Sequence, residues 1–492
     1  MDRRTLLKLG LAGGAATLLP VGQAIRTFAS GGFSSGRIPE SPPVPSFAVP
    51  LGIPPELQPV RSEGNTDYFL LTQQIAQVQI LPTGPKTTIW GYNGITPGPT
   101  IRQNRNRDHV VRQVNHLEVP VTVHLHGGDV RPEDDGHPTA LIQPGGYKDY
   151  HYPGLHPSAP LWYHDHSIHE TGRNVWMGLA GQYPIVSDEE LALPLPKGKY
   201  EVPLTIQDRF FLADNSIVYP TDGGEPFRQG VFGDVILVNG TPKPFFQVGR
   251  RKYLFRILNG SNARVYRLQL STGEPFIGIL AEGGFYPHPV PLPDITLMPS
   301  NRIGVVVDFS QYQVGQQIVL RNIFEDVPGD PYDEAKTREI MRFDVVDDAT
   351  DPTSIPNDLP SRVEPSEAEA ILTRDWRFER QNGAWAINKK LWDENRIDAF
   401  PKLGTVEVWR FVNSSGGWIH PIHPHLVEFR ILDRNGLPPR PEEGGPMDTA
   451  FLGRNEEVRV VMRFEHFKGI YAFHCHNVEH EDNDMMTQFQ VV

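Results

Sequence analysis

The sequence predicts an all-β protein built from several sandwich or barrel domains. Proline and glycine account for 47 and 46 of the 492 residues, which favours many turns over long helices. Short runs rich in Val, Ile, Tyr and Phe recur between turn signals, as in β-sandwiches and barrels. The sequence shows no long amphipathic helical pattern, and its length suits about three domains. The clearest predicted strands are 119–125, 202–206, 234–238, 253–258, 302–309, 405–412 and 457–464.

The first thirty residues predict an export signal. Arg3 and Arg4 precede an apolar run from Leu9 to Pro20, and alanines within residues 24–30 offer cleavage points. The run is too short and too rich in Gly and Ala for a good membrane span. The paired arginines favour a Tat-type signal, with an ordinary Sec signal as the alternative. We therefore expect a periplasmic or extracellular protein without a membrane span.

Proline-rich and acidic stretches divide the remainder of the chain. Residues 31–60 are rich in Pro and Gly and predict an arm, and the acidic stretch 347–369 predicts an interdomain linker. A softer break lies at 187–199. The net charge of −13 argues against nucleic acid as a partner, because phosphate binding needs a basic surface.

The single cysteine of the chain, Cys475, lies between His474 and His476. It has no intrachain partner for a disulfide, and a buried inert thiol is rarely flanked by imidazoles on both sides. His480 and Met485 follow within the next ten residues. Two imidazoles, a thiolate and a weak axial thioether are the ligands of a blue-copper electron-transfer site. This segment therefore predicts a mononuclear copper site.

Ten of the 18 histidines lie in or just after four short motifs. On an extended strand residues i and i+2 point to the same face, so each His-x-His pair aims two nitrogens one way. Four such pairs suit a cluster of metals rather than one ion. His420 has the opposite parity to His423 and His425, and Cys475 has the opposite parity to His474 and His476. His420 and Cys475 can therefore meet His480 and Met485 on the strand face opposite the histidine pairs. The pairs are His124 and His126, His164 and His166, His423 and His425, and His474 and His476.

The ligand types favour copper. Thiolate, imidazole and thioether together suit copper, whereas zinc prefers closed tetrahedral sites. Zinc at the histidine pairs alone is the alternative, but it leaves the Cys-His-Met set unexplained. The eight histidines outside the motifs are interpreted as surface or structural residues, with His137 and His169 as those to watch because they adjoin motif segments.

These four motifs, in this order and at these spacings, resemble those of the multicopper oxidases. The segment Trp90 to Ile101 resembles the family's first-domain signature, and His474 to Met486 is most similar to the branch of spore-coat laccases and bilirubin oxidases. The resemblance covers nearly all of the chain after the signal. It implies three cupredoxin-like Greek-key β-barrel domains, placed at residues 61–187, 188–350 and 366–492. Pro424 departs from the family pattern, which usually has Leu there; we expect a stiffer strand with intact ligands.

The resemblance also implies four coppers per chain. One, type 2, would be held by His124 and His423, and a type 3 pair by six further histidines. A type 1 copper would be held by His420, Cys475, His480 and axial Met485. The six type 3 ligands would be His126, His164, His166, His425, His474 and His476.

The implied reaction is one-electron oxidation of a substrate at type 1, coupled to reduction of dioxygen to water at the cluster. Glu481 and Asp135 match acids near the cluster in the laccase branch and are expected to relay protons, the alternative being solvated loop carboxylates. A small phenol or aromatic amine is the expected substrate, since the eight methionines form no insert of the kind that captures Cu(I). A cuprous or other metal-ion oxidase, a non-catalytic copper electron carrier and a structural protein with the same fold are the alternatives. We expect a monomer.

Overall fold

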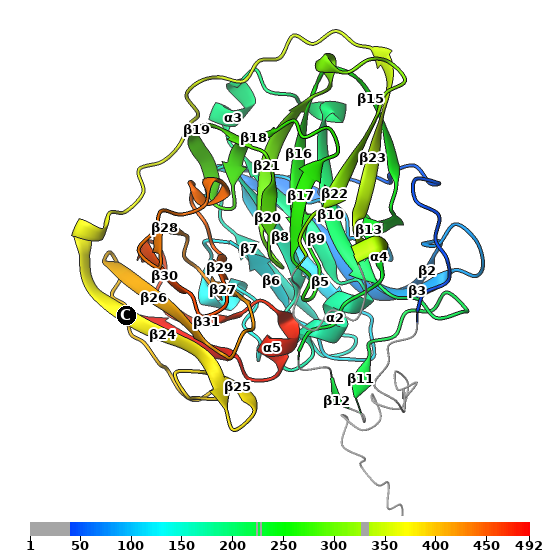
Figure 1. Ribbon diagram of the computed structural model, residues 1–492. Coiled ribbons are helices and arrows are strands. Elements are labelled where there is room, and N and C mark those ends of the chain that lie inside the picture. The colour runs from blue at the N-terminus through cyan, green and yellow to red at the C-terminus, as the bar shows by residue number, and fades with distance from the viewer. Residues whose placement is uncertain (1–39, 223–224, 227–228, 326–333) are drawn as a thin grey trace, which may run out of the picture.

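The computed structural model describes residues 40–222, 225–226, 229–325 and 334–492 (Figure 1). The predicted export signal and the start of the predicted arm lie outside these ranges. Within them the chain is mostly β-strand, as predicted, and the longest described helix, α2, has 7 residues. No described helix has the length and apolar character needed to cross a bilayer. The described helices are α2 (Thr171–Met177), α3 (Asp188–Ala192), α4 (Glu334–Thr337) and α5 (Val478–Asp482).

The described strands of residues 61–186 pair only with one another and form two sheets. Both sheets are mixed, and β2 pairs with β5 in parallel. The first sheet has the order β1 (Arg61–Glu63), β2 (Thr66–Val78), β5 (Asp108–Asn115), β7 (Tyr147–Tyr152), with β3 (Thr87–Tyr92) on β2. The second has the order β4 (Gln103–Asn104), β9 (Ala180–Val186), β8 (Ala159–Asp165), β6 (Val123–His126).

Residues 201–348 form a seven-stranded and a five-stranded sheet, drawn mainly in green in Figure 1. The first has the order β14 (Thr241–Pro242), β13 (Val235–Val238), β10 (Glu201–Arg209), β16 (Lys252–Asn259), β21 (Arg302–Asp308), β18 (Phe276–Ala281), β19 (Gly284–Leu292). The second has the order β15 (Phe245–Arg250), β23 (Glu339–Asp348), β22 (Gln317–Asn322), β17 (Tyr266–Leu270), β20 (Ile295–Leu297). A short ribbon pairs β11 (Thr221–Asp222) with β12 (Glu225–Pro226).

Residues 370–491, yellow to red in Figure 1, form the last two sheets. One has the order β25 (Ala384–Ile387), β24 (Ala370–Gln381), β26 (Val406–Ser414), β30 (Glu457–Arg463), β28 (Phe429–Arg434). The other has the order β29 (Ala450–Leu452), β27 (His420–Pro424), β31 (Gly469–Cys475), β32 (Met486–Val491). This last sheet carries two of the four ligand motifs, on β27 and β31, and β6 and β8 carry the other two.

One predicted strand is shorter than expected. The run 119–125 was predicted to be extended throughout, but β6 begins only at Val123. Pro120 has no N–H to donate to a ladder, and proline is confined to edges and strand starts. The preceding residues make only an isolated bridge, between Val121 and Ile142.

The segments predicted to be an arm and a linker are hydrogen-bonded to the first and second parts of the chain. Leu51 N donates to Phe245 O at 2.7 Å, and Leu57 N donates to Thr100 O at 2.8 Å, so the arm runs from the second part to the first. The linker lies along the second part, where Leu359 N donates to Pro287 O at 3.0 Å. Both segments are therefore fixed by backbone hydrogen bonds and are not flexible linkers at these positions.

Each part of the chain has its own hydrophobic core. That of the middle part centres on aromatic side chains of β16 and β23, packed against aliphatic side chains of β21. Phe255 is 1% exposed there, and its ring lies 5.2 Å from that of Phe343, centroid to centroid.

Phe255→Ala should destabilise the middle part by about 3–5 kcal/mol, because the lost burial is accompanied by a cavity that neighbours fill only partly. Differential scanning calorimetry should show a lower thermal midpoint. Val346→Ala, at a side chain that is 42% exposed, is the control and should change the midpoint little. An unchanged midpoint for Phe255→Ala would contradict this description of the core.

Candidate metal centre

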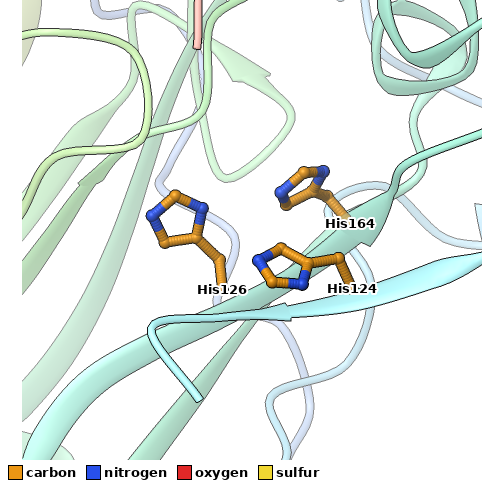
Figure 2. Close-up of side chains that lie close together, drawn as sticks. All are labelled: His124, His126 and His164. Atoms are coloured by element: carbon orange, nitrogen blue, oxygen red, sulfur yellow. The ribbon is translucent and has the colours of Figure 1, made fainter. Parts of the chain in front are cut away.

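The register of β6 and β8 places the first two histidine motifs side by side. His124 lies directly opposite His164 in the antiparallel ladder, and directly paired residues project from the same face. His126 follows two residues later on the same face of β6. Figure 2 shows the three rings gathered on one side of the two strands. They lie close enough for one ligand nitrogen of each to fall within 4.8 Å of the others.

The register of β27 and β31 separates the remaining motifs onto two faces, as the parity argument predicted. His423 lies opposite His474, and Ile422 lies opposite Cys475. His420 shares the parity of Ile422 and therefore projects to the same face as Cys475. One face of this strand pair thus joins the histidine cluster, and the other carries the thiol.

Eight imidazoles converge between the first and third parts of the chain, and every one is buried. His474 Nε2 lies 3.1 Å from both His166 Nε2 and His425 Nε2. His476 Nε2 lies 3.4 Å from His164 Nε2, and His124 Nε2 lies 3.4 Å from His423 Nε2. Burial lowers the pKa of several of these rings well below the ordinary value, His164, His423 and His425 among them.

The carboxylates beside the outer nitrogens of three rings indicate that this cluster fits a cation. His425 Nδ1 lies 2.7 Å from Asp135 Oδ2, and His474 Nδ1 lies 3.1 Å from Glu481 Oε2. His166 Nδ1 lies 3.3 Å from Glu481 Oε1. A carboxylate favours the N–H on the ring nitrogen nearest to it, which leaves the lone pair of each ring at Nε2. Three lone pairs that face one another in a dry interior repel unless a cation lies between them.

The ring of His126 presents its other nitrogen, Nδ1, to the cluster. Its Nε2 lies 3.0 Å from Asp448 Oδ1, and its buried Nδ1 has no hydrogen-bond partner. The nitrogen that this ring offers to the cluster is therefore Nδ1, whereas His423, next to it, donates from Nδ1 to Asp448 O at 2.8 Å and offers Nε2.

The second ligand set lies on the opposite face of β31. His420 Nδ1 lies 3.4 Å from Cys475 Sγ and 3.1 Å from His480 Nδ1, and Cys475 Sγ lies 3.6 Å from His480 Nδ1. All three residues are fully buried. Burial lowers the pKa of His420 to about 3 and raises that of the Cys475 thiol well above its ordinary value. The three atoms form the trigonal His₂Cys arrangement typical of blue-copper sites.

Met485 lies on the side of the thiol. Cys475 N donates to Met485 O at 3.0 Å, and the next residue, Met486, pairs with His474 in the ladder. Met486 therefore projects to the cluster face and Met485 to the face of Cys475. Both Met485 and Cys475 belong to the same buried core, and the role of Met485 as axial ligand stays a prediction.

Helix α5 holds His480 and Glu481 between all three parts of the chain. Asp482 accepts hydrogen bonds from Thr171 N and Gly172 N, at 3.0 and 2.8 Å, at the start of α2. Glu479 accepts from Tyr219, Val231 N and Asn262 of the middle part. A Cβ at Gly172 would meet Asp482 Oδ2 at 3.0 Å, so the absence of a side chain there permits this close approach. α2 and α5 lie side by side in Figure 1.

Both predicted acids lie against ligand histidines rather than in solvated loops. Asp135 is fully buried; its carbonyl accepts from His124 Nδ1 at 2.6 Å while its carboxylate contacts His425. Glu481, 2% exposed, contacts His166 and His474 and accepts from Thr171 Oγ1 at 2.8 Å. The turn after Asp135 needs Gly136, whose φ is +78° and whose Cβ would run into the backbone of Val123.

Sequence reasoning missed a buried carboxylate, Asp448, that contacts His126 and His423, together with its partners Glu282 and Arg302. These residues lie far apart in the sequence and form no spacing motif, so only the tertiary structure brings them together. His137 and His169, singled out earlier, do not join the cluster: His137 bonds Thr139 and Gln488, and His169 bonds Asp482 O.

Comparison with known proteins agrees with this geometry. Sequence profiles described as multicopper oxidase match residues 74–190 and 365–492. A bilirubin oxidase from Albifimbria verrucaria is 37% identical, with 91% of this chain and 82% of that protein covered. A laccase from Bacillus subtilis (strain 168) is 34% identical, with 90% and 98% covered.

The crystal structure of a laccase from Pediococcus acidilactici superposes with a TM-score of 0.84 at 33% identity, covering 92% of this chain and 95% of that one. The predicted fold class, three cupredoxin-like β-barrel domains, is thereby confirmed, whereas the exact domain boundaries stay a prediction. With this fold, these matches and its two buried His and His/Cys ligand sets, the chain belongs to the multicopper oxidases, which are oxygen-reducing oxidoreductases.

Proposed function

We propose that this multicopper oxidase is laccase-like and couples one-electron oxidation of phenols and aromatic amines to reduction of dioxygen to water. The observation that carries the proposal is the junction at Cys475. Its side chain belongs to the trigonal set, and its two neighbours in sequence belong to the histidine cluster. An electron-accepting site and an oxygen-reducing site are therefore joined by single peptide units.

We assign the buried residues to four coppers per chain. His420, Cys475 and His480, with Met485 as axial ligand, would hold type 1. His124 and His423 would hold type 2. The type 3 pair would be held by two triads, His126, His164 and His476, and His166, His425 and His474.

Bound copper would supply the one-electron chemistry, passing four electrons from four substrate molecules to one dioxygen, which takes up four protons to give two waters. The residues of the chain orient the ligands and handle those protons. Asp135 Oδ2 and both oxygens of Glu481 lie against Nδ1 atoms of ligand rings. Each carboxyl group is thus separated from the centre of the cluster by one imidazole ring and can hold a proton there. Burial keeps bulk water away from both.

The surroundings of His480 favour an aromatic substrate. The ring of Trp385 lies 3.8 Å from the ring of His480, and half-buried Trp418 lies edge-on to it at 6.1 Å. Exposed Arg380 lies over both indoles, at 4.0 and 5.6 Å. Trp385 is buried, whereas half-buried Trp418 and exposed Arg380 offer an indole and a guanidinium surface to a planar aromatic ring. The relatives named laccase and bilirubin oxidase also support an organic aromatic substrate.

A cuprous oxidase is the main alternative, and the positions of the methionines argue against it. In the described ranges six methionines are buried and Met177 is half-buried, so no thioether patch faces solvent there to capture Cu(I). A non-catalytic electron carrier needs only the trigonal set and leaves the eight clustered imidazoles without a use. Export and the monomeric state stay predictions.

The wild-type protein, loaded with copper, should contain about four coppers per chain and show an intense blue thiolate band that bleaches with a phenol and returns in air. Cys475→Ser should abolish the blue band and phenol oxidation, because a hydroxyl does not replace the thiolate, while the cluster keeps its coppers. Visible spectra with metal analysis test this. A blue Cys475→Ser protein would contradict the type 1 assignment.

Glu481→Gln should lower turnover on the order of 100-fold by slowing oxygen reduction, since an amide cannot shuttle a proton. The blue band should remain. Stopped-flow reoxidation of the reduced enzyme measures the affected step directly. Glu479→Gln, on the same helix but without a ligand contact, is the matched control. Equal reoxidation rates in Glu481→Gln and wild type would sink the proton-relay role.

Met485→Leu should raise the reduction potential of the type 1 copper, because the axial thioether stabilises the oxidised ion and leucine does not bind it. Redox titration of the blue band measures the shift. Met486→Leu should leave the potential near that of wild type, since Met486 lies on the other face of the strand. No shift in Met485→Leu would show that Met485 is not the axial ligand.

A further inference from the structure

The middle part of the chain supplies none of the assigned copper ligands, yet it reaches the cluster through one buried ion pair. Arg302, at the start of β21, donates from Nη1 and Nη2 to the two oxygens of Asp448, at 2.7 and 2.6 Å. Its exposed fraction is 2%, and that of Asp448 is 0%. Arg302 Nε also donates to Pro160 O of β8 at 2.9 Å, so this one side chain contacts all three parts of the chain.

Asp448 in turn touches two rings of the cluster. Its Oδ1 accepts from His126 Nε2 at 3.0 Å, and its backbone carbonyl accepts from His423 Nδ1 at 2.8 Å. The first contact leaves Nδ1 of His126 for the cluster, and the second leaves Nε2 of His423. The orientation of Asp448 therefore decides which nitrogen each of these two rings presents.

Glu282 fixes Asp448 from the opposite side. Its Oε2 accepts from Asp448 N and Thr449 N, both at 2.8 Å, and its Oε1 accepts from Asn301 Nδ2 at 2.6 Å. The carboxylate side chain of Asp448 is thus held by Arg302, and its backbone is held by Glu282. A guanidinium–carboxylate pair with two parallel hydrogen bonds defines the plane of the carboxylate as well as its position.

We infer that Arg302 and Glu282 are positioning residues that act through Asp448 to set the orientation of His126 and His423 toward the copper cluster. The inference rests on the copper sites of the proposed function. Since Arg302 engages both oxygens of Asp448, this carboxylate serves to orient ligands rather than to bind metal. The middle domain then helps to orient the ligands of the oxygen-reducing centre, in addition to connecting the two domains that carry those ligands.

Removal of the guanidinium has a defined consequence. Without Arg302 the carboxylate of Asp448 is a buried charge that has lost its cationic partner. Such a charge is strongly unfavourable, so we expect the carboxylate to leave its present position. His126 then loses the carboxylate that fixes its tautomer and keeps only the hydroxyl of Thr449, 3.3 Å from Nε2. Loss of a partner that orients a metal ligand typically costs 10–100-fold in metal affinity or activity.

Arg302→Met tests the inference, with Arg256→Met as the matched control. Arg256 lies on β16, the strand paired with β21, is also 2% exposed, and forms a buried ion pair with Glu190 and Glu201, but contacts no histidine. Both substitutions remove a buried guanidinium, so both should lower the thermal midpoint. Only Arg302→Met should alter the electron paramagnetic resonance signal of the type 2 copper and weaken copper retention by the cluster, on the order of 10- to 100-fold against a competing chelator. Its blue type 1 band should be unchanged.

Arg302→Lys provides a variant that is milder to folding. Lysine keeps the charge but binds as a point donor and does not define the carboxylate plane. Its type 2 signal and copper retention should lie between those of wild type and Arg302→Met. This graded recovery distinguishes orientation of Asp448 from a general loss of stability, which Arg256→Met reports separately.

A type 2 signal and copper retention equal to wild type in Arg302→Lys and Arg302→Met would overturn the inference while leaving the proposed function intact. So would equal cluster defects in Arg302→Met and Arg256→Met. A wild-type protein that shows no type 2 signal after loading would overturn the proposed function and this inference with it.

Discussion

The alternation of side chains along β31 is the constraint on which both ligand sets depend. His474 projects toward the other seven clustered imidazoles, and Cys475 projects toward His420 and His480 on the other face. A shift of one residue in the pairing with β27 would exchange these faces and destroy both sites together. The antiparallel register of His423 with His474 and of Ile422 with Cys475 is therefore the local feature that defines two separate centres at a fixed, short separation.

The three parts of the chain are arranged around this strand pair so that the sites are dry and rigid. Convergent lone pairs and buried carboxylates are unfavourable in a metal-free interior, and the surrounding network compensates by fixing each group. α5 is tied to the first part through Asp482 and to the middle part through Glu479. On the opposite side of the cluster, Arg302 and Glu282 hold Asp448. Stability and site geometry thus share the same interactions, as expected where orienting partners support metal ligands.

Much of the site could be predicted from the sequence because its information is local. The two-residue period of a strand is enough to place each His-x-His pair on one face and to set Cys475 and His420 apart from the cluster. The positions of Asp135 and Glu481 next to ligands came from family resemblance rather than from any physical pattern. By contrast, Asp448 lies 146 residues from Arg302 and 166 residues from Glu282 in the sequence. No periodicity connects positions so far apart. The strand predicted at 119–125 was too long because a proline within it weighs more than the β propensity of its valines.

Anomalous diffraction at the copper absorption edge, from crystals of the copper-loaded protein, would locate each metal in the two buried sets. We expect one copper within the triangle of His420, Cys475 and His480, and three coppers among the eight imidazoles, with His126 bound through Nδ1. Copper only within the triangle would reduce the protein to an electron carrier. Anomalous signal from zinc rather than copper at these positions, or from neither, would contradict the central claim that the two buried sets form one oxygen-reducing copper centre.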